Sequence, residues 1–557
     1  MSELHMNLSQ SELSTRAVNP RLSRNSMVAF LLVLMVTAAI LLALVLSILR
    51  LNNNTFTYTL DDPYIGLAFS DQIRHGNYGM NDGLHAAPAS SILFTFLLTP
   101  AVGTSLHPYL PLILNVLALY ATLVIIWRLF THLRLVEDTF GIVVQAVALL
   151  MLALCTNMIG VVFTGLEHNL HIAAVAATVY GITLFLDKGK MPVWLPAVIV
   201  LAPLLRYEGL ALSFAALLVL ALRGRWRTAA ATFALIILLV GGFSVFLVSL
   251  GLPPIPSSIL TKSAVVADGI SGTGIGFFNS IIVNVIRMAL VPSGALMLVI
   301  GVAAAVRCLR ELPLKTWRWS SQALMALLMV CLIGSHAVAG RFGWLDRYED
   351  YVMAGTALIG ICLMRDTIRK VLLNRKQRLI YIGLTAVPLL LICAEYIIST
   401  WHVPLAANNN YEQQFQMHRF VNDFYRAPVA VNDLGLVSYH NPNFVLDLGG
   451  LASEKARSLI LRHADAEAYR ELVSANNVHL VIIYDEWFPH QIPTSWVKVA
   501  SMDLSRKRVS SAESEVQFYA TDDDTAGKLH PELLSFSRGL PPGVKLIIYS
   551  PAADRVH

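Results

Sequence analysis

Residues 27–49 have the sequence MVAFLLVLMVTAAILLALVLSIL, an uncharged apolar run that is long enough to cross a bilayer as one helix. It exceeds the apolar core of a signal peptide, about 7–15 residues, and no small-residue cleavage site follows it. Such runs recur along the 557 residues, of which 56% are hydrophobic and 14% are charged. An ordinary soluble chain has about 25% charged residues. The sequence therefore predicts a polytopic α-helical membrane protein.

Eleven apolar windows are candidate transmembrane helices. They lie at 27–49, 108–130, 139–157, 167–186, 190–204, 208–222, 228–250, 281–306, 321–340, 348–366 and 379–399. The windows at 190–204 and 208–222 are short, so a broken helix pair or a re-entrant element is an alternative there. The apolar stretch 88–103 is interrupted by Pro100 and Gly103, and we interpret it as a juxtamembrane helix on the outer surface.

The distribution of Lys and Arg predicts the orientation of these helices. With the N-terminus in the cytoplasm, every strongly basic loop, such as 365–378 with its six cations, lies on the cytoplasmic side. The outer side has few cations, among them Arg206, Lys262, Arg341 and Arg347. Cations placed against the orientation rule are better candidates for function. The net charge of +5 therefore indicates topology and not a nucleic-acid partner.

Composition divides the chain into three parts. Residues 1–26 are polar and Ser-rich, so we expect a disordered cytoplasmic N-terminus. Residues 27–399 are the predicted membrane domain, whose first outer loop spans 50–107, and residues 400–557 are a predicted soluble α/β domain on the outer side. The expected strands of this domain are 428–431, 443–446, 478–484 and 544–549, with a helical stretch at 453–475.

The spacing of cysteines and histidines does not indicate a metal site. The five cysteines lie in or beside apolar runs without a CxxC pair, which is typical of packing residues. His75, His85 and His107, in or near the first outer loop, match no zinc spacing. We therefore predict neither a disulfide framework nor a zinc site.

The first outer loop contains the most informative motif, DDPYIGLAFSDQIRHGNYG at 61–79. Asp61, Asp62 and Pro63 are expected to open a short amphipathic helix at the membrane surface. An Asp before Pro is a favoured helix N-cap, so Asp62 is the better candidate for the cap. Asp61 is then left to face a cavity, where a carboxylate can act as a general base. A purely capping role for this pair is the alternative.

This motif, followed by PASSILF at 88–94, resembles the first outer loop of the GT-C superfamily of membrane glycosyltransferases, above all members of arabinofuranosyltransferase type. The resemblance implies a GT-C fold, and transfer of a sugar with inversion from a polyprenyl-phosphate carrier to a cell-envelope glycan, lipid or protein. An Asp of this loop is the catalytic base of the superfamily, which implies Asp61 or Asp62. Some members also bind a divalent cation, and no other cofactor is implied.

Two short motifs at the outer ends of predicted spans resemble further elements of these enzymes. They are GLEH at 165–168 and RYEG at 206–209. The resemblance implies substrate-binding roles for Glu167, His168, Arg206 and Glu208. The alternative is that these residues satisfy helix ends and form a structural ion pair at the interface.

Two later outer loops resemble the phosphate-binding elements of the superfamily. PPIPSS at 253–258, with Ser257 where these enzymes tend to have Asn, is followed by Lys262, which implies a donor-phosphate site at this lysine. Attraction to anionic lipid is the alternative. RFGWLDRYE at 341–349 implies phosphate binding by Arg347 and Arg341 and a substrate contact by Tyr348. An aromatic belt with an interfacial arginine is the alternative there.

Together these features predict an inverting glycosyltransferase on the outer face of the cytoplasmic membrane. Its partners would be a polyprenyl-phosphate sugar donor, a glycan, lipid or protein acceptor, and the bilayer. A transporter or flippase of lipid-linked glycan intermediates is the alternative, although the sequence has no visible inverted repeat. A third hypothesis is an assembly factor that the membrane part only anchors, but eleven predicted spans exceed what an anchor needs.

Overall fold

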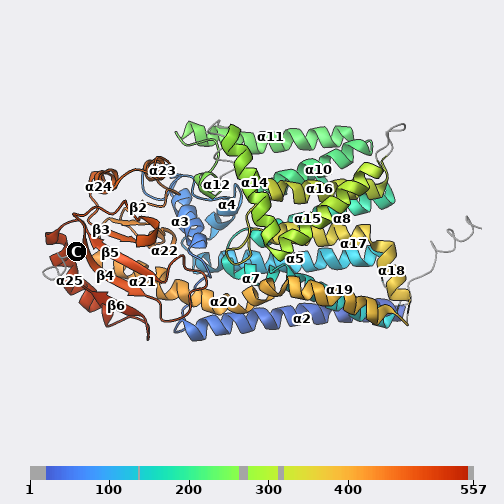
Figure 1. Ribbon diagram of the computed structural model, residues 1–557, viewed down its shortest axis with the longest axis horizontal. Helices are drawn as coiled ribbons and strands as arrows, with labels where there is room; N and C mark the ends of the chain where they lie inside the picture. The colour runs from blue at the N-terminus through green and yellow to red at the C-terminus, as the bar shows by residue number, and fades with distance from the viewer. Residues whose placement is uncertain (1–19, 136–137, 263–273, 312–318, 375, 550–557) are drawn as a thin grey trace, which may run out of the picture.

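The structure is a computed structural model that describes residues 20–135, 138–262, 274–311, 319–374 and 376–549. Long helices lie side by side along the longest dimension of the molecule, and the strands of the C-terminal part gather at one end of this bundle (Figure 1). The chain therefore has the two parts that its composition predicts, a helical part with candidate membrane spans and a mixed α/β domain.

Six helices of the described chain are long and apolar enough to cross a membrane. They are α2 (Pro20–Leu51), α5 (Leu110–Leu133), α8 (His168–Lys188), α11 (Trp226–Ser249), α15 (Pro292–Arg310) and α16 (Ser321–Ala339). Three bent pairs raise the number to nine if each pair is one span: α6 (Thr139–Cys155) with α7 (Met158–Val161) and η3 (Val162–Thr164), α17 (Asp350–Leu363) with α18 (Arg365–Leu373), and α19 (Arg378–Ile392) with α20 (Ala394–Glu412). Three shorter apolar helices, α9 (Leu195–Leu205), α10 (Gly209–Leu222) and the part Phe278–Leu290 of α14 (Gly274–Leu290), could add further spans, so the expected number of eleven is not confirmed.

Three expectations about helix boundaries are wrong. The window 281–306 is two helices, α14 (Gly274–Leu290) and α15, because Pro292 has no N–H to continue a helix but fits the first turn of a new one. Helix α2 already begins at Pro20, so residues 20–26 are helical and not disordered, while 1–19 lie outside the described residues. The stretch 88–103 contains two short helices, α4 (Phe94–Leu98) and η1 (Thr99–Ala101), instead of one surface helix.

The basic loop and the loops with the candidate site residues lie at different ends of the helical bundle. Helix α18, which holds Arg365, Arg369 and Lys370 of the six-cation loop, lies at the end farthest from the strands (Figure 1). Helices α3 (Asp62–Arg74) and α12 (Ser257–Lys262) lie at the other end, beside the α/β domain, together with α4. The basic loop and the candidate site loops are therefore at opposite ends of the bundle.

The C-terminal domain is built on a six-stranded mixed sheet with the order β2-β1-β3-β5-β4-β6. The strands are β1 (Val429–Val431), β2 (Val445–Asp447), β3 (Leu480–Ile483), β4 (Val497–Asp503), β5 (Glu515–Ala520) and β6 (Lys545–Ile548). The first three are parallel to one another, and β5, β4 and β6 pair in antiparallel fashion. The four predicted strands correspond to β1, β2, β3 and β6, whereas the sequence did not predict β4 and β5.

Different elements cover the two faces of this sheet. Helices α23 (Glu454–Leu461) and α24 (Ala466–Ala475), which replace the single predicted helical stretch 453–475, pack on one face. The other face contacts α21 (Gln414–Arg419), the π-helix η4 (Phe420–Tyr425), α22 (Gly435–Ser438) and α25 (Asp523–Ser537). Two 3₁₀ turns, η2 (His107–Tyr109) and η5 (Asp485–Trp487), complete the described elements.

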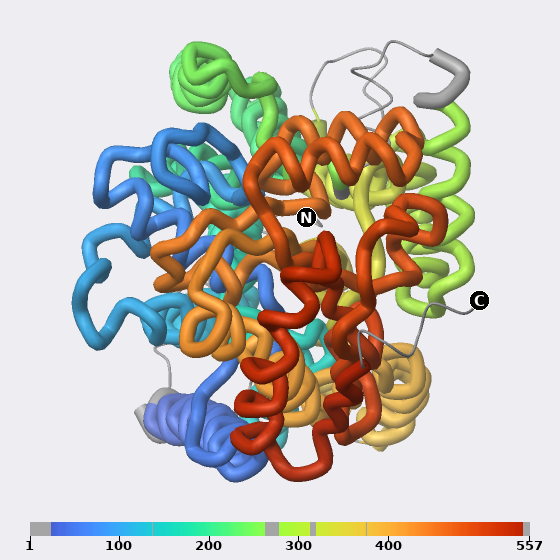
Figure 2. The backbone as a smooth tube through the Cα atoms, turned by 90° about the vertical axis from the view of Figure 1, so that its left-hand side faces the viewer, coloured from blue at the N-terminus to red at the C-terminus, as the bar shows by residue number. Residues whose placement is uncertain are grey.

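The first outer loop and the C-terminal domain share one hydrophobic core. Tyr64, Leu67 and Phe69 of α3 belong to the same buried cluster as Val437 of α22 and Phe518 of β5. In Figure 2, which looks onto the domain end, the blue first loop lies beside the orange and red C-terminal chain. Helix α20 also runs through the predicted boundary at residue 400 without a break. The domain is therefore joined to the membrane part by packing as well as by the chain.

Candidate functional site

Helix α3 begins at the two acidic residues that the sequence singles out. Asp61 is the residue before the helix and Asp62 its first residue, but the Asp61 side chain makes no capping bond to α3. The Asp62 carboxylate instead accepts a hydrogen bond of 2.7 Å from Nη2 of Arg347. The expectation that Asp62 caps the helix and Asp61 faces a cavity is therefore wrong, because each carboxylate has a partner from a distant segment.

The Asp61 carboxylate points into the C-terminal domain. Its two oxygens accept hydrogen bonds from the backbone N–H groups of Gly435 (2.6 Å) and Leu436 (2.8 Å), at the start of α22. Burial, together with the nearby carboxylate of Asp433, raises the pKa of Asp61 to about 8. Asp61 therefore connects α3 to the domain, and Asp62 is the carboxylate that lines a pocket.

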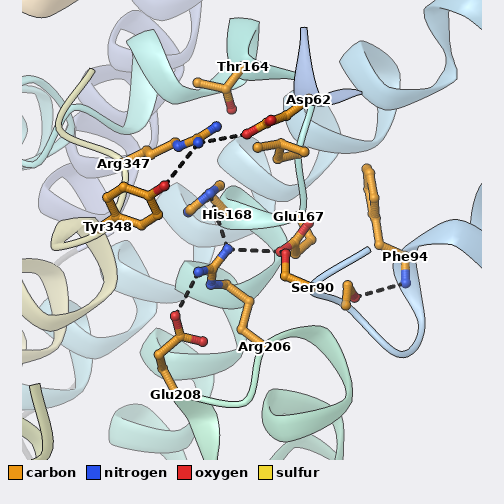
Figure 3. A network of polar contacts seen from close by, with 12 residues as sticks. Asp62, Ser90, Phe94, Thr164, Glu167, His168, Arg206, Glu208, Arg347 and Tyr348 are labelled. Carbon is orange, nitrogen blue, oxygen red and sulfur yellow. Dashed lines mark hydrogen bonds and ion pairs between the residues drawn. The ribbon is translucent and has the colours of Figure 1, made fainter. Parts of the chain in front are cut away.

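The guanidinium of Arg347 is buried, and only some of its N–H groups donate hydrogen bonds. Its Nη2 contacts Asp62 and the hydroxyl of Tyr348 (3.1 Å), and its guanidinium carbon lies 5.0 Å from the centre of the Tyr348 ring (Figure 3). Among the residues that the structure describes, Nε and Nη1 of Arg347 have no hydrogen-bond partner. Because leaving a buried donor unpaired is costly, these two atoms are suited to bind an anionic or polar group.

An unusual turn holds Arg347 in place. The three residues before it, Trp344, Leu345 and Asp346, all have positive φ angles of 52°, 63° and 53°. The side-chain amide of Asn157 donates a 2.8 Å hydrogen bond to the Leu345 carbonyl, and Ser399 donates to the buried carboxylate of Asp346. Left-handed backbone at non-glycine residues persists only when the surroundings enforce it, and such turns cluster at functional sites.

Arg206, which the sequence predicts to bind substrate, is the centre of a buried network. Its Nη1 donates to Glu167 (2.9 Å) and to Nε2 of His168 (3.2 Å), and its Nη2 donates to Glu208 (2.7 Å) (Figure 3). Ser90 of the first outer loop donates to the same Glu167 oxygen (3.2 Å). Residues that the sequence predicts at three separate span ends are thus brought together in one cluster.

Close backbone approach makes this cluster possible. Gly165, two positions before Glu167, has φ +64°, and a Cβ on it would lie 2.8 Å from Cβ of Pro63. Only glycine therefore lets the start of α8 pack directly against the start of α3. The result is that Asp62 and Glu167 line the same small pocket, together with Ser90 and with Leu451 of the C-terminal domain.

A larger cavity of about 300 Å³ is lined by both arginines, and Ser90 lines this cavity as well as the small pocket. Of the predicted residues, His168, Arg206, Glu208, Arg341, Arg347 and Tyr348 line it. Tyr207, Ser258 and His336 also line it, and each has a buried side-chain polar atom without a partner in the described part of the chain. A cavity with several unpaired polar atoms is suited to a polar ligand.

Lys262 and Arg341 differ from Arg347, the third predicted phosphate ligand. Lys262 ends α12, and its side chain lies outside what the structure describes. Ser257, at the start of the same helix, contacts the carbonyls of Ala87 and Leu451, which connects this loop to the first outer loop and to the domain. Arg341 is exposed and lies at the cavity wall near Tyr348. The role of Lys262 therefore stays a prediction.

Several cavity residues were not predicted from the sequence. Tyr207 lies inside the RYEG motif, and Ser258 follows Ser257, so both are next to residues that the motifs had singled out. His336 is in an apolar helix and carries no such signal. In the described part of the chain, no three His, Cys, Asp or Glu side chains are close enough together to hold a metal ion.

Comparisons with known proteins concern the domain and the fold. Residues 403–519 match a family model described as a domain of unknown function (DUF8728). No curated protein matches the chain. The crystal structure of the Archaeoglobus fulgidus oligosaccharyltransferase in complex with zinc and sulfate is similar at 11% identity and a TM-score of 0.43, covering 91% of this chain and 74% of that chain.

Two further solved structures are similar to the chain. Oligosaccharyltransferase AglB from Archaeoglobus fulgidus, in complex with an inhibitory peptide and a dolichol-phosphate, has 12% identity and a TM-score of 0.39, covering 92% of this chain and 75% of that chain. A mutant of arabinofuranosyltransferase AftD from Mycobacteria has 12% identity and a TM-score of 0.38, covering 87% of this chain and 41% of that chain, so the alignment spans less than half of that protein.

Proposed function

We propose that the protein is an inverting glycosyltransferase of the cytoplasmic membrane, which transfers a sugar from a polyprenyl phosphate to a cell-envelope acceptor on the outer face. The observation that carries the proposal is the contact of Arg347 with Asp62. One nitrogen of this buried guanidinium pairs with the carboxylate, and its Nε and Nη1 have no partner among the described residues. A phosphate-binding group and a candidate base thus lie side by side at one site.

Arg347 is the proposed ligand of the donor phosphate. A buried guanidinium carries a fixed positive charge and donates hydrogen bonds to phosphate oxygens, and Nε and Nη1, on different edges of the group, are the donors left available. When the sugar leaves, the phosphate gains negative charge, which a fixed cation in a water-poor cavity stabilises well. Arg341 and Lys262 are proposed to add positive charge near the same phosphate.

The donor sugar is proposed to occupy the 300 Å³ cavity. Tyr207, Ser258 and His336 offer unpaired polar atoms to its hydroxyl groups, and Tyr348 offers an aromatic face. Arg206, held by Glu167 and Glu208, forms the polar wall between this cavity and the smaller pocket. Burial alone would raise the pKa of Glu208, but the Arg206 guanidinium outweighs it and lowers this pKa to about 2. Glu208 is thus a charged hydrogen-bond acceptor for the sugar.

Asp62 is the proposed general base. The acceptor hydroxyl would enter through the small pocket that Asp62 and Ser90 line. Asp62 takes the proton of this hydroxyl while the hydroxyl oxygen bonds to the anomeric carbon of the sugar. The bond from that carbon to the phosphate oxygen breaks, and the polyprenyl phosphate leaves on the Arg347 side. Attack and departure on opposite faces invert the configuration of the sugar.

Proteoliposomes that contain the full chain test this proposal. They are given a panel of radiolabelled polyprenyl-phosphate sugars and cell-envelope acceptors, and label in the acceptor is measured with its anomeric configuration. We expect transfer by the wild-type chain, none above background by Asp62→Asn, and normal transfer by Asp71→Asn, a matched change near the other end of α3. Movement of the labelled lipid across the bilayer without covalent transfer would contradict the proposal and favour a flippase.

A further inference from the structure

The backbone that leads into Asp62 is held from the C-terminal domain. Asn410 of α20 is buried, and its side-chain amide donates to the carbonyls of Tyr58 (3.0 Å) and Leu60 (2.8 Å). These carbonyls lie only four and two positions before Asp62. One side-chain amide therefore fixes the direction in which the chain enters α3.

A second contact holds the same segment from a different element. The Asp61 carboxylate accepts the backbone N–H groups of Gly435 and Leu436, so residue 61 is attached to α22. The packing is tight, because a Cβ on Gly435 would lie 2.2 Å from the Asp61 carbonyl oxygen and 2.7 Å from its carboxylate. Tyr58, Leu60 and Asp61 are thus all fixed by residues of the segment 403–519.

Two other contacts join the domain to the walls of the small pocket. Asn81 of the first outer loop donates to the Val445 carbonyl and accepts from the Val445 N–H, both at 2.9 Å, which continues the edge strand β2. Ser257 contacts the Leu451 carbonyl, and Leu451 itself lines the pocket that contains Asp62. The domain therefore contacts the site loops at several independent points.

We infer that the domain of unknown function at 403–519 is a clamp that positions the proposed base, with Asn410 and Asp61 as its positioning residues and Gly435 as the position that permits the contact. The inference rests on the proposed role of Asp62. Neither Asn410 nor Asp61 lines either cavity, so both act through the backbone that carries Asp62. Acceptor transfer requires the carboxylate to be held in one place, and a displacement of about 1 Å can lower a rate about 100-fold.

Asn410→Ala and its neighbour Asn409→Ala form a matched pair for the test. Asn409 is also buried in α20, but its side chain contacts Lys507 and Val509 inside the domain and not the first outer loop. We expect Asn410→Ala to lower kcat about 10- to 100-fold with the KM for a polyprenyl-phosphate sugar unchanged, and Asn409→Ala to keep kcat within about threefold. Gly435→Ala should reproduce the kcat loss, because its methyl group pushes on Asp61 from the other side.

Hydrogen exchange measured by mass spectrometry gives a readout that does not depend on activity. Asn410→Ala and Gly435→Ala should speed amide exchange in residues 58–62 at least about fivefold, whereas Asn409→Ala should leave it unchanged. Equal kcat losses in Asn409→Ala and Asn410→Ala, or unchanged exchange in residues 58–62, would overturn the clamp. Absence of transfer by the wild-type chain would contradict the proposed function instead, so the two failures are distinguishable.

Discussion

Nη2 of Arg347 lies 2.7 Å from Oδ2 of Asp62, although 285 positions separate the two residues in the chain. The Arg347 side chain is 3% exposed and that of Asp62 25%. The guanidinium is thus fixed in the protein interior, while the carboxylate keeps access to the small pocket. This asymmetry is why we assign the phosphate to the arginine and the proton transfer to the aspartate.

Replacing Arg347 separates its charge from its geometry. Arg347→Lys keeps a cation but removes the planar donors Nε and Nη1, so we expect kcat/KM for the donor to fall about 100-fold or more. Initial rates with a polyprenyl-phosphate sugar in proteoliposomes measure the effect. Arg223→Lys, at the end of α10, is the matched control and should retain full activity. Full activity in Arg347→Lys would exclude phosphate binding through the Nε and Nη1 donors of Arg347.

The two ion pairs of Arg206 predict which of two substitutions, Glu167→Gln or Glu208→Gln, destabilises the protein more. The Glu167 side chain is 3% exposed and that of Glu208 is 35% exposed, although both bind Arg206. Breaking a buried ion pair costs about 3–5 kcal/mol, and the cost falls as solvent reaches the pair. Glu167→Gln should therefore lower the thermal midpoint of unfolding, followed by tryptophan fluorescence in detergent, more than Glu208→Gln. The reverse order would contradict the described burial.

Removing the hydroxyl of Tyr207 should raise the stability of the protein and weaken donor binding. Its hydroxyl is buried without a partner in the described chain, a condition that costs about 1–3 kcal/mol when no ligand is bound. Tyr207→Phe should therefore raise the unfolding midpoint of the ligand-free protein and also raise the KM for the donor about 10-fold. Thermal unfolding and initial rates on the same preparation check both signs. A raised midpoint with an unchanged KM would remove Tyr207 from the sugar site.

Asp61 makes stability depend on pH in a defined direction. Its pKa is raised from 3.8 to about 8 in the folded protein, so the folded state binds the proton more tightly than the unfolded chain. The stabilising contribution is complete below pH 3.8 and is lost as the pH rises toward 8. The unfolding midpoint of the wild-type protein should therefore fall over this range relative to Asp61→Asn, which cannot titrate. Parallel pH profiles for the two proteins would contradict this prediction.

Hydropathy and charge predicted the main helices and the clustering of the site loops, because both follow from local composition. Arg206 and Arg347 stood out as cations placed against the orientation rule, and Glu167 was predicted from the resemblance of the GLEH motif. The partner of Asp61 could not be predicted, because local capping rules cannot detect Gly435, whose N–H group binds Asp61 from 374 positions away. Strands β4 and β5 were missed because polar residues such as Lys498 and Gln517 interrupt their apolar pattern.

The measurement that tests the account most directly compares Asp62→Asn with Asp61→Asn in single-turnover transfer from a radiolabelled polyprenyl-phosphate sugar. Both variants replace a carboxyl group by an amide of the same size at adjacent positions, so differences in packing or membrane insertion are minimised. We expect a rate below detection for Asp62→Asn and a loss of about 10- to 100-fold for Asp61→Asn, which keeps the base but loosens its support. Normal transfer by Asp62→Asn, with or without loss in Asp61→Asn, would contradict this expectation.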